Sequence, residues 1–319
     1  MENRVLVTAT NYSRYCAPAK ALLESRGFEI VENEFGRPMT FDELKTRVPD
    51  ICGVIVGVDT WNEDVFALAP ALKIMGRFGI GVDNIDLAAA KRHGIKVMNA
   101  RGINADSVAE YAVGLMLACL RDIVGMDRST REGKWVRSMG HTIRGKKVGF
   151  VGFGAISQYA AKLLIGFGAE LYAFDMFPNR EAAAALGVTM TDFDSIVRDC
   201  DIVSLHVPGT PETTKLMGKR QFDMMKPGAI LINTARGQVV DEAALFAALK
   251  ERRIAGAGLD VYESEPTTGS NPLFGLDNVV VGAHTAAETY ETYEAVSMAT
   301  AQAIIDVMEG KDPRNWLNP

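Results

Sequence analysis

The stretch VGFVGFGAIS, residues 148–157, decides the fold. It begins with an apolar run rich in valine and then turns through Gly152 and Gly154. The residues that follow, ISQYAAKLLIGFG (156–168), have the apolar spacing of a helix. A strand that passes through a glycine loop directly into a helix is typical of a βαβ unit in a parallel sheet. The pattern G-x-G-x-x-G is complete except at Ser157, which stands in place of the third glycine.

This loop predicts a dinucleotide-binding site. Gly152 permits the tight turn, and Gly154 lets the backbone approach a pyrophosphate at the helix N-terminus, where free N–H groups and the helix dipole favour anions. The third glycine of the pattern serves helix–strand packing rather than phosphate contact. Ser157 adds one small hydroxymethyl group there, so we expect the anion site to be intact.

The residue after the next strand predicts which dinucleotide binds. The strand ELYAF (170–174) ends at Asp175, about twenty residues beyond the loop, as the fingerprint requires. A carboxylate at this position accepts hydrogen bonds from the adenosine ribose and repels a 2′-phosphate. We therefore expect NAD rather than NADP, although Arg180 lies close enough in sequence to weaken that preference.

Composition excludes several other classes of protein. The chain has 319 residues, 48% hydrophobic, with a net charge of −6, which fits two globular domains and gives no basic surface for nucleic acid. The longest apolar run, YAVGLMLACL (111–120), is too short for a bilayer, and no basic membrane-binding stretch is present. MENRVLVTAT at the N-terminus fits a first strand rather than a secretory signal. The four cysteines are scattered without metal or disulfide spacing, so we expect a cytoplasmic protein.

Alternation of strands and helices along the whole chain predicts an α/β protein with two parallel sheets. We expect a substrate-binding domain, residues 1–98 plus 286–319, into which an NAD-binding domain, residues 99–285, is inserted. Two capping-box patterns predict helix starts, SVAE (107–110) and TAAE (285–288). The helix from Ser107 is too apolar to stand in water, so it is expected to pack between domains or subunits.

Three polar stretches follow apolar strands, where open α/β sheets bind ligands: ILINTARGQVVD (230–241), GLDVYESEP (258–266) and VVVGAHTAAE (279–288). Together with GRFGIGVDNID (76–86) and the glycine loop, they show that the chain resembles the D-isomer-specific 2-hydroxyacid dehydrogenases, closest to the phosphoglycerate dehydrogenase group. The resemblance covers essentially the whole chain. It implies a Rossmann NAD-binding domain, a flavodoxin-like substrate domain, hydride transfer between NAD(H) and a 2-hydroxy or 2-keto acid, and a homodimer.

Three residues are the candidate catalytic set. His284 suits proton exchange with the substrate hydroxyl because the pKa of an imidazole lies near neutrality. A helix N-terminus disfavours the imidazolium, so a carboxylate partner is needed, and Glu265 stands at the family's partner position with Pro266 behind it. Arg236 carries a planar fork of donors that can bind a carboxylate in bidentate fashion. This hydride mechanism needs no metal, and no cluster of side chains has metal-ligand spacing.

By the same resemblance, further residues bind the cofactor and the substrate. The cofactor residues are Gly152, Gly154, Ala155, Ile156, Asp175, Val207, Pro208, Thr234, Ala235 and Asp260, the last holding the nicotinamide carboxamide. The substrate carboxylate is expected on amides around Gly79, Ile80 and Gly81, and Asp83 and Asp86 are expected to cap the helix that follows. Of the other histidines, His93 is expected at a helix C-terminus, His141 in a polar loop and His206 in a structural role near the cofactor.

The substrate is left open between 3-phosphoglycerate and glyoxylate, hydroxypyruvate or another 2-keto acid. Many phosphoglycerate dehydrogenases carry an arginine–serine pair after the third strand, whereas the stretch here is VGVDTWNED (56–64). Arg101, where the family often has proline, is a candidate second anion contact. An alternative of another class is an NAD-sensing binding protein, like the corepressor relatives of this family. REGKWVRSMG (131–140) is either a contact with a partner subunit through Trp135 or a segment packed on its own domain; the sequence does not decide between them.

Overall fold

The computed structural model describes residues 3–319 and divides them into two compact units. Unit 1 comprises residues up to Asn104 together with Glu288–Pro319, and unit 2 comprises Ala105–Ala287. These boundaries lie a few residues from those expected from the sequence. Arg101, which the sequence analysis assigned to the inserted domain, belongs to unit 1.

Unit 1 contains a five-stranded parallel sheet in the order β2-β1-β3-β4-β5. Because β3 is flanked by two other strands and covered on both faces, all six of its residues are buried. The order reverses between β1 and β3, which is the flavodoxin-like arrangement. The strands are β1 (Arg4–Val7), β2 (Glu29–Glu32), β3 (Ile51–Val56), β4 (Ile74–Arg77) and β5 (Lys96–Met98).

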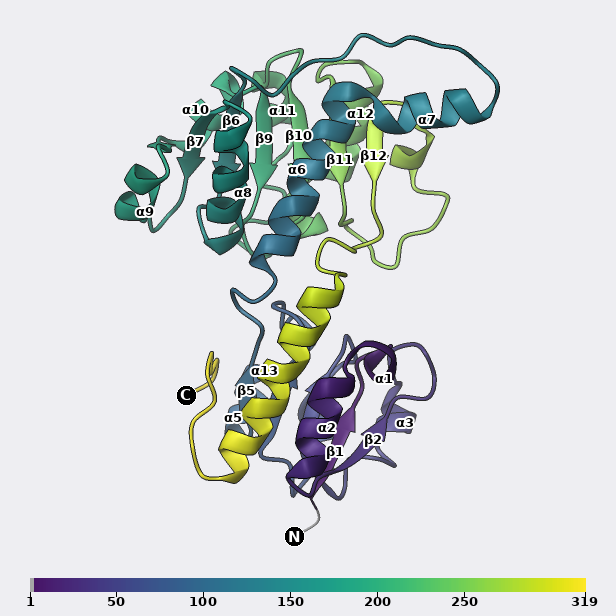
Figure 1. Cartoon of the computed structure of the whole chain (residues 1–319), viewed down its shortest axis with the longest axis vertical. Coiled ribbons are helices and arrows are strands. Elements are labelled where there is room, and N and C mark those ends of the chain that lie inside the picture. Colours follow the sequence, from purple (N-terminus) through teal and green to yellow (C-terminus); the bar gives the residue numbers. More distant parts are fainter. Residues whose placement is uncertain (1–2) are drawn as a thin grey trace. The chain divides into compact units, whose positions relative to one another are not determined.

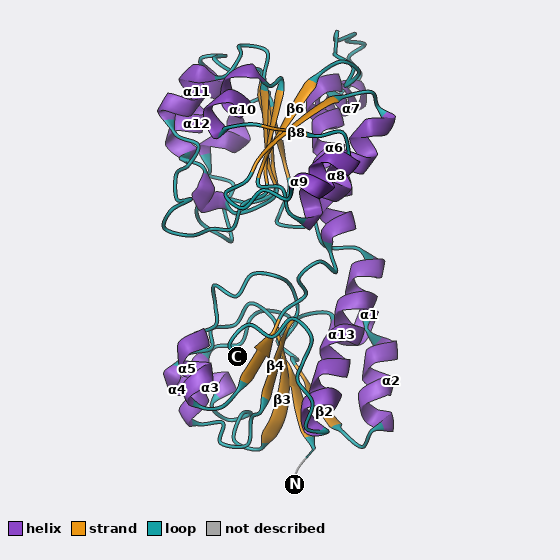
Figure 2. Ribbon diagram, turned by 90° about the vertical axis from the view of Figure 1, so that its left-hand side faces the viewer, coloured by secondary structure: helices purple, strands orange, loops and turns teal. Residues whose placement is uncertain are grey.

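Helices cover both faces of this sheet (Figure 2). On one face lie α1 (Tyr12–Tyr15), α2 (Ala17–Ser25) and the long C-terminal helix α13 (Tyr290–Met308); on the other lie α3 (Phe41–Leu44), α4 (Glu63–Ala67) and α5 (Leu87–Arg92). Close approach of α13 to the sheet depends on Gly76, since a Cβ there would lie 2.9 Å from Thr300 Cβ. The helix from the end of the chain therefore completes the unit that the N-terminus begins.

Unit 2 contains a seven-stranded parallel sheet in the order β12-β11-β10-β9-β6-β7-β8. The order reverses between β6 and β9, which is the switch point of a Rossmann fold, and ligands bind beyond the carboxyl ends of strands at such a point. The strands are β6 (Lys147–Val151), β7 (Glu170–Phe174), β8 (Thr189–Met190), β9 (Ile202–Leu205), β10 (Ile230–Asn233), β11 (Gly256–Leu259) and β12 (Val279–Val281).

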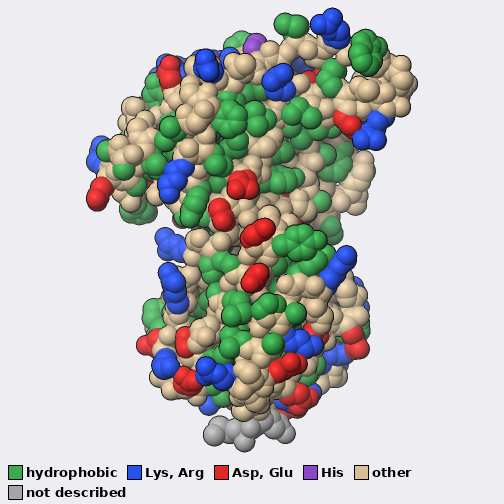
Figure 3. Space-filling model, viewed as in Figure 1, with side chains coloured by type: hydrophobic (Ala, Val, Ile, Leu, Met, Phe, Trp, Pro, Cys, Tyr) green, Lys and Arg blue, Asp and Glu red, His purple; other side chains and the backbone are tan. Residues whose placement is uncertain are grey.

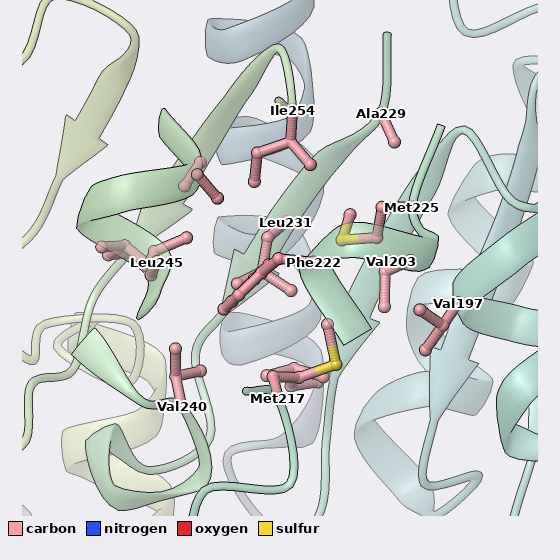
Figure 4. Packing of buried hydrophobic residues seen from close by; sticks show 14 of the residues in the cluster. Val197, Val203, Met217, Phe222, Met225, Ala229, Leu231, Val240, Leu245 and Ile254 are labelled. Atoms are coloured by element: carbon pink, nitrogen blue, oxygen red, sulfur yellow. The ribbon is translucent and has the colours of Figure 1, made fainter. Parts of the chain in front are cut away.

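Two helical layers sandwich this sheet (Figures 1 and 2). One layer contains α6 (Ala105–Arg121), α7 (Ile123–Arg131), α8 (Ala155–Gly166) and α9 (Arg180–Ala185); the other contains α10 (Phe193–Asp199), α11 (Lys219–Met224) and α12 (Glu242–Lys250). In the second layer, Phe222 of α11 and Leu245 of α12 pack over Leu231 of β10 (Figure 4). Two short 3-10 turns, η1 (Gly237–Val239) and η2 (Pro272–Gly275), complete the unit.

Both expected capping boxes are wrong. Helix α6 begins at Ala105, and Ser107 is a buried residue inside its first turn rather than a cap. Helix α13 begins at Tyr290, where the Thr289 side chain accepts from the Thr292 N–H. Thr285 does not cap that helix because it lies five residues before Tyr290, and its N–H donates to Asp260 instead. The apolar face of α6 packs on α8 and on strands β10, β11 and β12 of its own unit, so this burial requires no second domain or subunit.

Candidate active site

The glycine loop between β6 and α8 has one glycine whose side-chain position is blocked and one that is open. Gly152 has φ 92°, and a Cβ there would lie 2.5 Å from the His206 carbonyl oxygen, so only glycine fits. A Cβ on Gly154 would meet nothing within 4 Å among the described residues. The Ser157 hydroxyl donates to the Gly152 carbonyl over 2.6 Å and is fully buried. The serine in place of the third glycine therefore fastens the loop to the helix.

Asp175 is bound to this loop from the end of β7. Its Oδ2 accepts from the Phe153 N–H at 2.7 Å, and its Oδ1 accepts from the Phe177 N–H at 2.8 Å. These bonds hold the carboxylate directly beside the glycine loop. It lies at the end of the strand that neighbours β6 on the outer side of the switch point.

The residues around the loop fit a dinucleotide. No side chain caps α8 at Gly154, so the first N–H groups of the helix, including those of Ala155 and Ile156, are available to an anion. Val207 and Pro208 follow β9, while Thr234 and Ala235 follow β10, all at the carboxyl edge of the sheet. Thr234 Oγ1 is buried and has no hydrogen-bond partner within residues 3–319, so it is available to a ligand at this edge.

His284 and Glu265 form a pair. His284 Nδ1 lies 2.6 Å from Glu265 Oε2, and Glu265 Oε1 accepts from the Tyr262 N–H at 2.9 Å. Burial raises the pKa of Glu265, but the bonds from His284 and Tyr262 and the nearby charge of Arg236 outweigh it, so the pKa is lowered overall. Glu265 is thus held as a carboxylate, while the imidazole is half exposed.

Asp260 fixes the backbone that carries His284. It is fully buried, its Oδ1 accepts from the Thr285 N–H at 3.0 Å, and its Oδ2 accepts from the Ala286 N–H at 2.8 Å. The His284 N–H also donates to the Asp260 carbonyl oxygen at 2.7 Å, and His284 has φ 56°, a conformation that non-glycine residues rarely adopt. Both carboxylate oxygens of Asp260 are therefore already bound within the chain.

Arg236 lies on the neighbouring loop, directly before Gly237. Its Nη1 donates to the Ala235 carbonyl at 2.7 Å, and Asn233 donates to the Arg236 carbonyl at 3.0 Å. A Cβ on Gly237 would lie 1.8 Å from the Tyr262 carbonyl carbon, so this glycine lets the loop after β10 touch the loop after β11. That contact brings Arg236 near Glu265, and unit 2 therefore assembles the three candidate catalytic side chains at one sheet edge.

In unit 1, the loop after β4 presents two amides. Gly79 has φ 147° and its N–H donates to the Arg77 carbonyl at 2.8 Å. Within residues 3–319, the N–H groups of Ile80 and Gly81 donate to no acceptor. Consecutive free amides in a glycine loop are a carboxylate-binding arrangement. Of the three residues expected here, Ile80 and Gly81 thus offer donors, whereas the Gly79 amide is occupied.

Two hydrogen bonds of Asn99 connect the Arg101 backbone with this loop. The Arg101 N–H donates to Asn99 Oδ1 at 3.2 Å, and Asn99 Nδ2 donates to the Ile80 carbonyl at 2.7 Å. The Arg101 side chain is exposed, and its guanidinium has no partner within the described residues. On the other side of the loop, Asp86 caps α5 by accepting from the Ala89 N–H, whereas Asp83 does not cap it.

The remaining histidines have local partners or lie on the surface. His93 ends α5, as expected, and its Nε2 lies 2.6 Å from Glu63 Oε1. His206 Nε2 lies 2.8 Å from Ser204 Oγ, and burial lowers the pKa of His206 to about 4. His141 is exposed. No group of three or more histidine, cysteine or acidic residues suited to a metal ion occurs in residues 3–319, and no helix there is long and apolar enough to cross a membrane.

Sequence reasoning missed several polar residues near these loops. Arg77 Nε donates to the Gly81 carbonyl at 2.8 Å, and the buried Oδ1 of Asn104 has no partner within the described chain. The hydroxyl of Tyr111 lies 3.5 Å from Thr285 Oγ1. The one available signal was position, since Arg77 ends β4 and Asn104 immediately precedes α6.

Comparison with known proteins agrees with this geometry. A family model described as D-isomer specific 2-hydroxyacid dehydrogenase, NAD binding domain, matches residues 113–286. The chain is 44% identical over 299 residues to the D-3-phosphoglycerate dehydrogenase of Archaeoglobus fulgidus, covering 93% of this chain but only 56% of that protein. It is 37% identical over 311 residues to the glyoxylate reductase of Korarchaeum cryptofilum, covering 93% of each.

Solved structures give the same result. The TT0316 protein from Thermus thermophilus matches with a TM-score of 0.90 and 33% identity, covering 98% of this chain and 99% of that one. The apo-structure of D-lactate dehydrogenase from Escherichia coli matches with a TM-score of 0.86 and 31% identity over 98% of this chain and 99% of that one. The chain therefore belongs to the D-isomer-specific 2-hydroxyacid dehydrogenases, a family of NAD-dependent oxidoreductases that act on the CH–OH group of 2-hydroxy acids.

Proposed function

We propose that this protein is an NAD-dependent D-2-hydroxyacid dehydrogenase that interconverts a 2-hydroxy acid and its 2-keto acid. The observation that carries the proposal is the pairing of His284 Nδ1 with Glu265 Oε2 at 2.6 Å, next to the loop of Arg236. An imidazole held by a carboxylate is an acid–base group, and a guanidinium beside it is a carboxylate anchor. Reduction of a keto acid needs both.

Each residue has one part in this reaction. NADH, when bound, supplies the hydride to C2 of the substrate. Arg236 binds the substrate carboxylate and stabilises the charge that develops on the neighbouring oxygen. His284 donates a proton from Nε2 to that oxygen, since its Nδ1 is occupied by Glu265. Glu265, held as a carboxylate, orients the imidazole by binding its Nδ1.

The cofactor residues are those at the carboxyl edge of the unit 2 sheet. We assign the pyrophosphate to Gly154, Ala155 and Ile156 at the open start of α8, with Gly152 shaping the turn. Val207 and Pro208 flank the adenosine side, Thr234 and Ala235 lie along the cofactor, and Asp260 lies at the nicotinamide end. Because Oδ1 already accepts from the N–H and the hydroxyl of Thr285, and Oδ2 from the Ala286 N–H, the second lone pair of Oδ2 is what remains for a carboxamide N–H.

Asp175 supports a preference for NAD over NADP. The Phe153 and Phe177 amides hold its carboxylate beside the glycine loop, where a carboxylate repels a 2′-phosphate. Replacing it by asparagine is expected to raise the ratio of kcat/KM for NADPH to that for NADH at least ten-fold. If the ratio is unchanged, another residue sets the preference.

For the substrate, the amides of Ile80 and Gly81 offer donors to the carboxylate, and Arg101 offers a second cation. A free, exposed guanidinium suits an acid with a second anionic group, such as 3-phosphoglycerate, whereas glyoxylate and hydroxypyruvate have no such group. The Arg101→Ala variant is expected to raise the KM of the phosphorylated substrate about ten-fold more than that of the plain one. An equal change for both would remove Arg101 from substrate recognition.

The deciding experiment is a panel of 2-keto acids tested with NADH and NADPH in parallel. We expect oxidation of NADH by at least one keto acid and loss of turnover in the His284→Asn variant. The panel includes 3-phosphohydroxypyruvate, hydroxypyruvate, glyoxylate and pyruvate. Tight NADH binding without turnover of any of them would contradict the enzyme and favour an NAD-sensing binding protein.

Three wider proposals follow. Unit 2 is the NAD-binding domain and unit 1 the substrate domain. The protein is located in the cytoplasm. A homodimer would cover the segment after α7, where Trp135 is 88% and Met139 is 95% exposed. At the top of the face drawn in Figure 3, green hydrophobic side chains lie among blue basic ones. Light scattering of the wild type and a Trp135→Ser, Met139→Ser double variant tests this, and a monomeric wild type would contradict it.

A further inference from the structure

The loop after β4 has all four of its carbonyl groups, from Phe78 to Gly81, bound within unit 1. Arg77 takes the first and the last, with Nη1 2.5 Å from the Phe78 oxygen and Nε 2.8 Å from the Gly81 oxygen. The Ala100 N–H donates to the Gly79 oxygen at 2.9 Å. The side chain of Asn99 donates to the Ile80 oxygen at 2.7 Å.

These bonds determine where the loop amides point. In a trans peptide the C=O and the N–H of one planar unit point in opposite directions. The Gly79 carbonyl and the Ile80 N–H share one such unit, and the Ile80 carbonyl and the Gly81 N–H share the next. Since Ala100 and Asn99 bind these two carbonyls, the two amides point to the side opposite Ala100 and Asn99. Ala100 acts through its backbone N–H, whereas Asn99 acts through its side chain.

Asn99 is itself held firmly. It is 6% exposed, its Oδ1 accepts from the Arg101 N–H, and its carbonyl accepts from Asn315 Nδ2 at 3.2 Å. Asn315 also donates to the Arg101 carbonyl at 3.1 Å. Asn99 therefore connects the Ile80 carbonyl with the backbone of Arg101, and Asn315 binds the carbonyls of both Asn99 and Arg101.

We propose that Asn99 is a positioning residue. By binding the Ile80 carbonyl, it orients the Gly81 amide toward the substrate carboxylate. The proposal rests on the proposed function, in which the Ile80 and Gly81 amides bind that carboxylate. Asn99 does not touch the substrate. Without its donor group the peptide between Ile80 and Gly81 is free to rotate, and the carboxylate loses one hydrogen bond to its charge.

The experiment compares Asn99→Ala with Asn315→Ala. The second variant removes the bonds to the Asn99 and Arg101 carbonyls but leaves the Asn99 contact with Ile80, so it controls for loosening of the segment. In Asn99→Ala we expect the keto-acid KM to rise about ten-fold or more, with kcat changed less than about three-fold, because a hydrogen bond to a charged group is lost. The KM of the matching neutral 2-keto amide should not rise, and NADH affinity should be unchanged.

A second readout does not depend on turnover. Oxamate, a carboxylate analogue of a 2-keto acid, is titrated into 15N-labelled protein with NADH present, and the Gly81 amide resonance is followed. It should shift on saturation in the wild type and in Asn315→Ala, and much less in Asn99→Ala. Circular dichroism checks that each variant is folded.

The outcomes separate the two proposals. Equal Gly81 shifts and equal keto-acid KM values in the wild type and Asn99→Ala would overturn the role of Asn99. Turnover by the wild type without any Gly81 shift would also overturn it, while the proposed function would stand. A wild type that neither reduces a keto acid nor binds oxamate would contradict the proposed function itself, and the role of Asn99 with it.

Discussion

The Nδ1 atom of His284 lies 2.6 Å from the Oε2 atom of Glu265, although the two residues follow different strands. The pKa of Glu265 is lowered overall because the bonds from His284 and Tyr262 outweigh its burial, so it remains a carboxylate where keto-acid reduction is measured. That carboxylate binds Nδ1 and holds the ring so that Nε2 is left for the substrate. We expect Glu265→Gln, which removes this carboxylate, to lower kcat for reduction ten- to hundred-fold at neutral pH.

Steady-state kinetics of keto-acid reduction at neutral pH measures this, with Glu263→Gln as a matched control. Glu263 lies on the same loop, and its Oε1 accepts from the Glu242 N–H rather than from His284. Its substitution should leave kcat unchanged. Equal kcat values for wild type and Glu265→Gln would mean that Glu265 does not act on His284.

Arg236 is expected to act through the shape of its guanidinium as well as its charge. Nη1 is bound to the Ala235 carbonyl, which fixes the plane of the group. A lysine keeps the charge but cannot make the bidentate contact with a carboxylate. We therefore expect Arg236→Lys to lower kcat/KM for keto acids by about 10²- to 10³-fold, with NADH affinity and the melting temperature nearly unchanged.

Steady-state kinetics with several keto acids checks this, and Arg252→Lys is the control because Arg252 pairs with Asp277 at the surface. A loss that appears equally with a neutral keto amide would show that Arg236 does not bind the carboxylate.

The sequence allowed the sheets, their order of strands and helices, and the residues at strand ends to be predicted, because burial and periodicity are local properties. Ser157 could be judged harmless from its size, but its bond to the Gly152 carbonyl depends on loop geometry that no local pattern encodes. The helix starts at Ser107 and Thr285 were wrong for a similar reason. Capping patterns describe local preferences, whereas Ser107 is buried within its helix and Asp260, 25 residues away, binds the Thr285 amide.

The catalytic residues of the candidate site could be predicted from the sequence, but the residues that hold their loops in place could not. Arg236 and His284 were predicted because each follows an apolar strand, and Glu265 because it stands at the partner position that the family resemblance implies. The glycine at position 237 and the asparagine at position 99 were not found, because their effect depends on contacts with Tyr262 and Ile80. Such contacts join segments distant in sequence, and only the folded chain shows them.

His206 should make the protein sensitive to acid. Burial lowers the pKa of His206 from its usual 6.5 to about 4, so as pH falls the unfolded chain takes up this proton before the folded one does. The free energy of unfolding is therefore highest, as far as this group is concerned, above pH 6.5, and it falls progressively as pH falls toward 4. We expect His206→Gln, which keeps a polar group near Ser204, to give a shallower fall of the unfolding free energy over this range.

Urea unfolding at several pH values measures that slope. His141→Gln is the control, since His141 is exposed and its substitution should leave the slope as in the wild type. Parallel curves for wild type and His206→Gln would show that this imidazole is not the group responsible.

Ser157 is expected to stabilise both the fold and the cofactor loop. Its buried hydroxyl donates to the Gly152 carbonyl, and removing it leaves that acceptor without this donor. Ser157→Ala should lower the free energy of unfolding by about 1 kcal/mol and weaken NADH binding a few-fold by loosening Gly152. Ser157→Gly restores the third glycine of the pattern but adds the backbone entropy of glycine in a helix, so it should cost about 0.5–1 kcal/mol more than alanine. Denaturant unfolding and NADH titration of both variants measure these effects. If glycine bound NADH as tightly as serine while alanine did not, packing rather than the hydroxyl would be the function of this position.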